Sequence, residues 1–154
     1  MKIIKKLTFA ALAVTLLFQT STARADNSAP VRLTFEKSIA GGGPAGYLFH
    51  FLGSFDGDFT GTLFTGVQVA QTIDKQGNII HLEADYVFTD ANGIRSFTAH
   101  VEGNQNSHTG KAVLNGVVTA GSLKGAQVQV QFEIVECPTL CFQGTVVILP
   151  ASAD

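Results

Sequence analysis

Two histidines and two carboxylates lie at alternate positions in two neighbouring segments of the chain. The first segment contains His81 and Glu83, and the second contains His100 and Glu102. Between them lies Asp90–Gly93, whose first and last residues are typical of a type I turn. A four-residue loop at this point predicts an antiparallel hairpin in which Glu83 faces His100 and His81 faces Glu102.

Opposed Cβ atoms in such a hairpin are about 4.5–5.5 Å apart, so each histidine would reach a carboxylate. The set could supply an acid and a base, as in an isomerase or cyclase that uses no cofactor, or it could bind a divalent ion such as zinc. The simpler interpretation is a solvated outer face, because polar residues that alternate along an antiparallel sheet usually face water. We therefore expect no metal and no cofactor, and the enzyme is an alternative hypothesis.

A second candidate group is aromatic. Tyr47, Phe49, Phe51 and Phe55 share one side of a predicted strand, because all four occupy odd positions. An aromatic-lined cavity in a small barrel is a usual site for a small apolar molecule. The same spacing also fits a hydrophobic core. These four residues are the predicted ligand-binding set.

The chain contains two cysteines, Cys137 and Cys141, on either side of a short Pro-Thr-Leu turn. This spacing differs from the C-x-x-C of redox motifs, and no second pair is present to complete a zinc site. A disulfide is the simplest prediction, and closing so short a loop would stabilise the fold by roughly 2 kcal/mol.

The elements that would position these residues are β-strands. Val, Thr, Phe and Ile dominate between turns rich in Gly, Asn and Asp, and no stretch of ten or more residues after Asp26 has apolar residues at helical spacing. The predicted strands are 31–37, 47–55, 59–66, 67–73, 79–89, 94–102, 111–120, 123–136 and 142–149. They predict one all-β domain, a small antiparallel barrel of eight or nine strands, with a β-sandwich as the alternative.

Short turns also predict the pairing of strands. Asp74–Gly77 repeats the turn pattern of Asp90–Gly93, and Gly121-Ser122 fits a two-residue II′ turn. The turns predict that Tyr86 faces Phe97 and that Val69 faces Leu82. In the C-terminal hairpin they predict that Phe132 faces Val146.

The first 25 residues have the composition of a cleavable signal peptide. Lys2, Lys5 and Lys6 precede the apolar run 8–18, and Ala23-Arg24-Ala25 matches the small-x-small cleavage pattern. As a helix the run would span only about 16 Å, too short to cross a bilayer. We expect a signal peptide at 1–25, a mature domain at 26–154, and export to the periplasm or the outside of the cell.

Removing the predicted leader takes four of the ten basic residues with it. The remainder has six basic and twelve acidic residues, a net charge of −6, which argues against a nucleic-acid partner. The leading hypothesis is an exported, non-enzymatic domain that binds a small apolar molecule. A further alternative is a surface or matrix protein that uses the Gln-rich strand 126–136 as a sheet edge.

Overall fold

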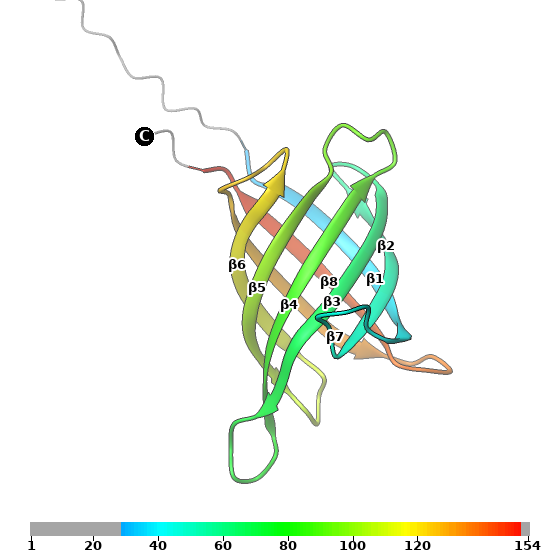
Figure 1. Cartoon of the computed structure of the whole chain (residues 1–154), viewed down its shortest axis with the longest axis vertical. Coiled ribbons are helices and arrows are strands. Elements are labelled where there is room, and N and C mark those ends of the chain that lie inside the picture. Colours follow the sequence, from blue (N-terminus) through cyan, green and yellow to red (C-terminus); the bar gives the residue numbers. More distant parts are fainter. Residues whose placement is uncertain (1–28, 152–154) are drawn as a thin grey trace, which may run out of the picture.

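The computed structural model describes residues 29–151 as a closed antiparallel barrel of eight strands, each paired with its neighbour in the sequence (Figure 1). The barrel closes where the first strand pairs with the last. The strands are β1 (Val31–Gly42), β2 (Phe49–Gly57), β3 (Gly61–Thr72), β4 (Ile79–Asp90), β5 (Phe97–Asn106), β6 (Ala112–Gly121), β7 (Gln127–Val135) and β8 (Cys141–Leu149). The predicted antiparallel barrel is thus confirmed. The predicted signal peptide lies outside the described residues.

Side chains alternate between the barrel interior and the outer face along each strand. In β7 the interior residues Val128, Val130 and Phe132 are buried, whereas Gln129 and Gln131 between them are exposed. β4 follows the same rule, with Leu82 and other apolar residues buried at alternate positions. Between residues 29 and 151, no helix has the length and apolar composition that a membrane crossing would need.

The predicted strands 59–66 and 67–73 form a single strand, β3, which contains a bulge. Val67 pairs with Ala84 and Val69 pairs with Glu83, so Gln68 is an extra residue without a partner in the ladder. The bulge reverses the alternation of side chains along β3. The predicted pairing of Val69 with Leu82 is wrong for this reason, and the barrel has eight strands.

The predicted register of the β4–β5 hairpin is wrong by two residues. Tyr86 pairs with Ala99, and the last paired residues are Phe88 and Phe97. The hydrogen-bonded turn predicted at Asp90–Gly93 is present, because the Gly93 N–H donates to the Asp90 carbonyl oxygen. However, the loop continues past this turn before β5 begins. A shift of two residues keeps every side chain on its face but changes its partner across the strands.

The other predicted turns differ in a similar way. In the β7–β8 hairpin Phe132 pairs with Gly144 instead of Val146, which is again a shift of two residues. The β6–β7 connection runs over residues 122–126 and is therefore longer than the predicted II′ turn. The Asp74–Gly77 turn has the expected hydrogen bond from the Gly77 N–H to the Asp74 carbonyl oxygen.

Aromatic rings fill one end of the barrel, where the β2–β3, β4–β5 and β6–β7 connections meet; we call it the aromatic end. Phe55, Phe59, Phe88 and Phe97 are buried there, and the Phe88 and Phe97 rings stack with centroids 4.5 Å apart. Arg95 covers this cluster from outside, with its guanidinium carbon 4.5 Å from the centroid of the Phe59 ring.

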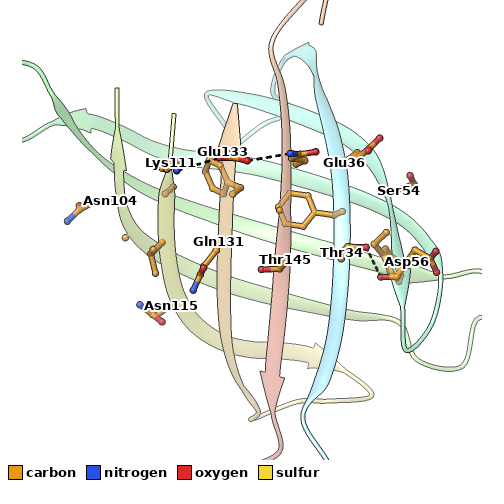
Figure 2. A pocket seen from close by; sticks show the side chains of 18 residues that line it. Thr34, Glu36, Ser54, Asp56, Asn104, Lys111, Asn115, Gln131, Glu133 and Thr145 are labelled. Carbon is orange, nitrogen blue, oxygen red and sulfur yellow. Dashed lines mark hydrogen bonds and ion pairs between the residues drawn. The ribbon is translucent and has the colours of Figure 1, made fainter. Parts of the chain in front are cut away.

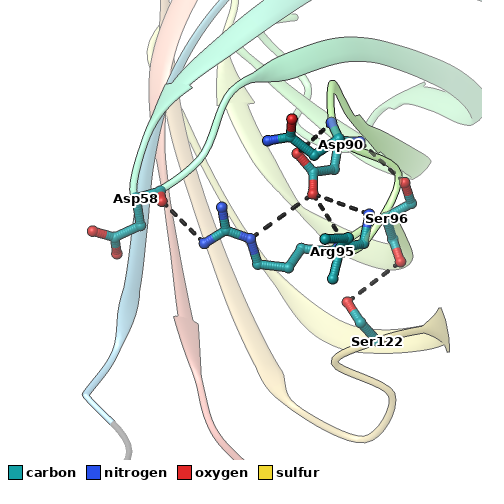
Figure 3. A network of polar contacts seen from close by, with 7 residues as sticks. Asp58, Asp90, Arg95, Ser96 and Ser122 are labelled. Carbon is teal, nitrogen blue, oxygen red and sulfur yellow. Dashed lines mark hydrogen bonds and ion pairs between the residues drawn. The ribbon is translucent and has the colours of Figure 1, made fainter.

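A polar network ties the loops of the aromatic end together (Figure 3). The buried Asp90 carboxylate accepts N–H groups of Asn92, Ile94 and Arg95, and Arg95 Nη1 donates to the Asp58 carbonyl oxygen. These bonds stabilise a β4–β5 loop that is longer than the predicted four residues, and they explain why the strands do not pair directly beside the Asp90–Gly93 turn.

Replacing Asp90 by Asn should weaken the fold in a pH-dependent way. Burial raises the pKa of Asp90, but hydrogen bonds from three backbone N–H groups and the charge of Arg95 outweigh it and hold the pKa below its ordinary value. Stability from this group is therefore present above pH ~4 and is lost as the pH falls further. We expect D90N to unfold several degrees below the parent at pH 7 and the gap to narrow at pH 3, as followed by circular dichroism. A gap that is the same at both pH values would contradict this assignment.

Candidate functional site

A cavity of about 220 Å³ lies at the opposite end of the barrel, which we call the open end. Most of its lining residues lie in the parts of the strands next to the β1–β2, β3–β4, β5–β6 and β7–β8 connections. Its walls are almost entirely apolar. The lining residues are Lys37, Phe49, Phe51, Thr65, Val67, Ala70, Ile80, Leu82, Ala84, Tyr86, Gln105, Leu114, Phe132, Leu140 and Phe142.

The Cys137–Cys141 disulfide closes the turn that carries Leu140, one of the residues that line this cavity. The predicted bond is present and closes the turn between β7 and β8. Next to it, the Leu140 carbonyl oxygen accepts the Ile39 N–H at 2.9 Å, which joins the turn to β1. The side chain of Leu140 lines the cavity. The disulfide therefore stabilises the turn that carries one wall of the opening.

In the described part of the chain, Lys37 is the only basic residue that lines the cavity, and it is 5% exposed. On β1 it follows the interior residues Leu33 and Phe35, so strand alternation directs it inward. Its amine nitrogen lies 2.7 Å from the Tyr86 hydroxyl and 3.4 Å from the Thr65 hydroxyl. The amine thus has two neutral hydroxyl partners.

Aromatic rings surround the Lys37 amine. The nitrogen lies 4.2 Å from the centroid of the Tyr86 ring, 5.0 Å from that of Phe132 and 5.1 Å from that of Phe51. Two more rings, Phe35 and Phe142, are within 5.9 Å. Ring faces attract a cation, but they replace only part of the hydration that an ammonium loses on burial.

The charged form of Lys37 has no anionic partner in the described part of the chain. None of the ion pairs among residues 29–151 involves this lysine. Burial lowers the pKa of the Lys37 ammonium well below its ordinary value, and burial also raises the pKa of the Tyr86 phenol. The pair therefore combines an amine that readily loses its proton with a phenol that keeps its own.

The predicted aromatic set is divided between three places. Phe49 and Phe51 line the cavity. Phe55 belongs to the aromatic end, where it contacts the rings of Phe59 and Phe88. Tyr47 precedes β2 and lies on the outer face. Alternation assigned Phe55 to the correct side of β2, but it carries no information on the height of a residue along the barrel.

Tyr47 belongs to a polar network on the outer face that centres on Asp85. One Asp85 carboxylate oxygen accepts the Tyr47 hydroxyl at 2.9 Å and the Gln68 amide at 2.8 Å. The other lies 2.9 Å from His100 Nδ1. The hydrogen bond to Asp85, together with burial, raises the pKa of Tyr47. This network fixes the start of β2 against β3, β4 and β5.

The four predicted acid–base residues also lie on the outer face, but not in the predicted pairs. Glu83 lies opposite Glu102, and His81 lies opposite Asn104. His100 pairs with Asp85 and not with Glu83. The two-residue shift in the β4–β5 register accounts for these differences.

Three of these side chains come close together on the outer face. His81, Glu83 and Glu102 each have one nitrogen or oxygen atom within 4.8 Å of the other two, a spacing that is also found among the ligands of a metal ion. His81 Nε2 lies 3.4 Å from Glu83 Oε1 on the same strand, and Glu102 is exposed. Solvent reaches all three side chains and screens the charges of the two carboxylates.

A wide groove runs over the outer face of β5, β6, β7, β8, β1 and β2 (Figure 2). Lys111 and Glu133 form an ion pair there at 3.8 Å, and Gln143 donates to Glu133. Figure 2 shows its polar side chains spread over several strands and not directed at a common point. The apolar cavity at the open end is therefore the better candidate site.

Lys37, Tyr86 and Thr65 were not among the site residues predicted from sequence. The predicted first strand ended at position 37, which made Lys37 an ordinary polar terminus. The sequence does contain a pattern that could have identified Lys37 as an interior residue. Apolar residues occupy the alternate positions on either side of it, at Val31, Leu33, Phe35 and Ile39. A lysine in the middle of such a set is directed into the core.

Comparison with known proteins gives no family model that matches this chain, and no curated protein or solved structure matches it.

Proposed function

We propose that this protein is an exported, non-enzymatic binder of a small apolar molecule, which it holds in the cavity at the open end. The observation that carries this proposal is a largely apolar cavity with one cluster of polar groups, the Lys37–Tyr86 pair with Thr65. Gln105 also lines the cavity, but its amide donates to the Gly110 carbonyl oxygen. Apolar cavities with a few polar groups are the usual form of small-molecule sites. The N-terminal sequence pattern and the Cys137–Cys141 disulfide support export.

The size and chemistry of the cavity limit the ligand. At about 220 Å³ it exceeds the ~150 Å³ that accommodates benzene, and it is smaller than the ~300 Å³ at which drug-sized sites begin. A substituted single ring or a short branched chain fits this range. We infer that the ligand has an apolar body and one polar group that faces Lys37.

The other two hypotheses have less support. The acid–base residues His81, Glu83, His100 and Glu102 lie on an outer face, and none of them lines the cavity at the open end. The interaction hypothesis used the Gln-rich strand as a free edge, but β7 pairs with β6 on one side and with β8 on the other.

Calorimetric titration with 4-ethylbenzyl alcohol, a neutral single-ring probe, tests the proposal. We expect one site per chain, a Kd between micromolar and millimolar, and a negative heat-capacity change from apolar burial. Ala84 lines the cavity and is buried, so A84L should fill part of it and weaken binding at least tenfold. The matched control is A120L on the exposed face of β6, which should bind as the parent does. A parent protein that takes up no alcohol, or an A84L variant that binds it equally well, would refute the proposal.

A further inference from the structure

The geometry points to a covalent role for Lys37: its amine forms an imine with the carbonyl group of a small apolar aldehyde that enters the cavity. This inference rests on the proposed function, because the aldehyde must first occupy the cavity. It adds the chemical class of the ligand and a residue that bonds to it.

The surroundings of Lys37 favour a nucleophilic amine. An exposed lysine has roughly one amine in 2,500 unprotonated at pH 7. Lys37 is buried among aromatic rings and, within residues 29–151, forms no ion pair that would hold its proton. Desolvation in an apolar pocket is a known way to activate a lysine for attack on carbonyl compounds. Its lowered pKa agrees with this geometry.

Tyr86 is placed to transfer the protons that imine formation requires. Its hydroxyl lies 2.7 Å from the Lys37 nitrogen, within the range for direct proton transfer. Since burial keeps the phenol protonated, it can donate to the carbonyl oxygen and then recover a proton from the nitrogen. Thr65 provides a second hydroxyl at 3.4 Å that can orient the same oxygen.

The reaction balances without an oxidant or a reductant. The nitrogen lone pair attacks the carbonyl carbon, and the electrons of the C=O π bond move to the oxygen, which takes a proton from Tyr86. The nitrogen returns one proton to Tyr86, which leaves a carbinolamine. The C–O bond then breaks, the second proton of the nitrogen leaves with the oxygen as water, and the lone pair closes the C=N bond. The products are one imine and one water, which leaves through the open end.

Reductive trapping tests the inference on the whole protein. The protein is incubated at pH 7 with 4-ethylbenzaldehyde, the aldehyde counterpart of the alcohol probe, and sodium cyanoborohydride, which reduces an imine to a stable amine. Peptide mass spectrometry then locates the label. We expect Lys37 to be labelled at least tenfold faster than Lys75, Lys111 or Lys124, which serve as controls within the same chain. Excess 4-ethylbenzyl alcohol should slow labelling of Lys37 and leave the other three unchanged.

Two variants separate chemistry from placement. K37R should lose the label at position 37, because a guanidinium does not form the imine. Y86F keeps the amine and, at saturating aldehyde, where binding no longer limits the rate, should slow its labelling at least tenfold.

The failures of the two proposals are distinguishable. If the alcohol binds but the label is spread evenly over the lysines, the imine inference is overturned and the binding function remains. Tighter binding of 4-ethylbenzoate than of the alcohol, with no trapping at Lys37, also overturns it and indicates an ion-pair site. If neither alcohol nor aldehyde enters, both proposals fail.

Discussion

Replacing Lys37 and Tyr86 together is expected to make the protein more stable and to abolish aldehyde capture. The double variant K37M/Y86F exchanges the buried amine and the buried hydroxyl, 2.7 Å apart, for apolar groups of similar shape. Exchanging buried polar pairs for apolar groups is commonly neutral or stabilising, by roughly 1–4 kcal/mol for charged groups. We expect a higher midpoint of urea unfolding with an unchanged m-value. A barrel folded solely for its own stability would gain by losing this pair.

The single variants provide the control. K37M leaves the Tyr86 hydroxyl without its closest partner, and Y86F does the same to the Lys37 amine. An unpartnered buried group costs about 1–3 kcal/mol, so both single variants should be less stable than the double variant. A double variant that unfolds more readily than either single variant would show that the pair holds the barrel together, and the case for a site would weaken.

The dependence on pH should identify Lys37 as the source of the difference. Its pKa is lower in the folded protein than the ~10.4 expected in the unfolded chain. Between these two values the unfolded chain binds a proton that the folded protein does not, so the stability of the parent rises with pH by up to ~1.4 kcal/mol per unit. The advantage of K37M/Y86F should therefore shrink as the pH rises from about 7 to about 9.5. Among residues 29–151, Tyr86 is the only other titratable group that faces this amine, and it stays protonated over that range.

The faces of the strands were predictable because an error of two residues in register leaves them unchanged. The β4–β5 pairing was wrong by two residues, yet Ala84 and Tyr86 are interior and His81 and Glu83 are exterior, as alternation predicts. The register itself was not predictable from turn residues. It depends on three N–H groups that bind the Asp90 carboxylate and lengthen the loop.

The composition of the site was predictable only in part, since the sequence gives the side of a strand and not the height along the barrel. Phe51 and Phe55 share the inner face of β2, but the first lines the cavity and the second packs at the aromatic end. Lys37 meets Tyr86 across 49 residues of sequence. The curvature of the closed barrel brings β1 and β4, which are separated by β2 and β3, to the walls of one cavity.

The two ends of the barrel are expected to differ sharply in what they contribute to stability. Phe97 lies at the aromatic end, is 3% exposed and stacks on Phe88, whereas Phe49 is half-buried at the cavity mouth. Truncating a fully buried Phe to Ala costs about 3–5 kcal/mol. We expect F97A to lose this amount in urea unfolding and F49A to lose less than half of it, because its neighbours already border an empty space.

The effects on ligand capture should be reversed. Folded F97A should still trap 4-ethylbenzaldehyde at Lys37 at the parental rate, because its ring lies outside the cavity lining. F49A should trap the aldehyde at a rate that differs from the parental rate, since the ring that it removes borders the entrance. If the two truncations cost equal stability, or if F97A loses capture while it remains folded, the cavity is not separate from the core. If F97A loses more stability than F49A and still captures the aldehyde, the aromatic end of this barrel serves stability and its open end is free to hold a reactive lysine.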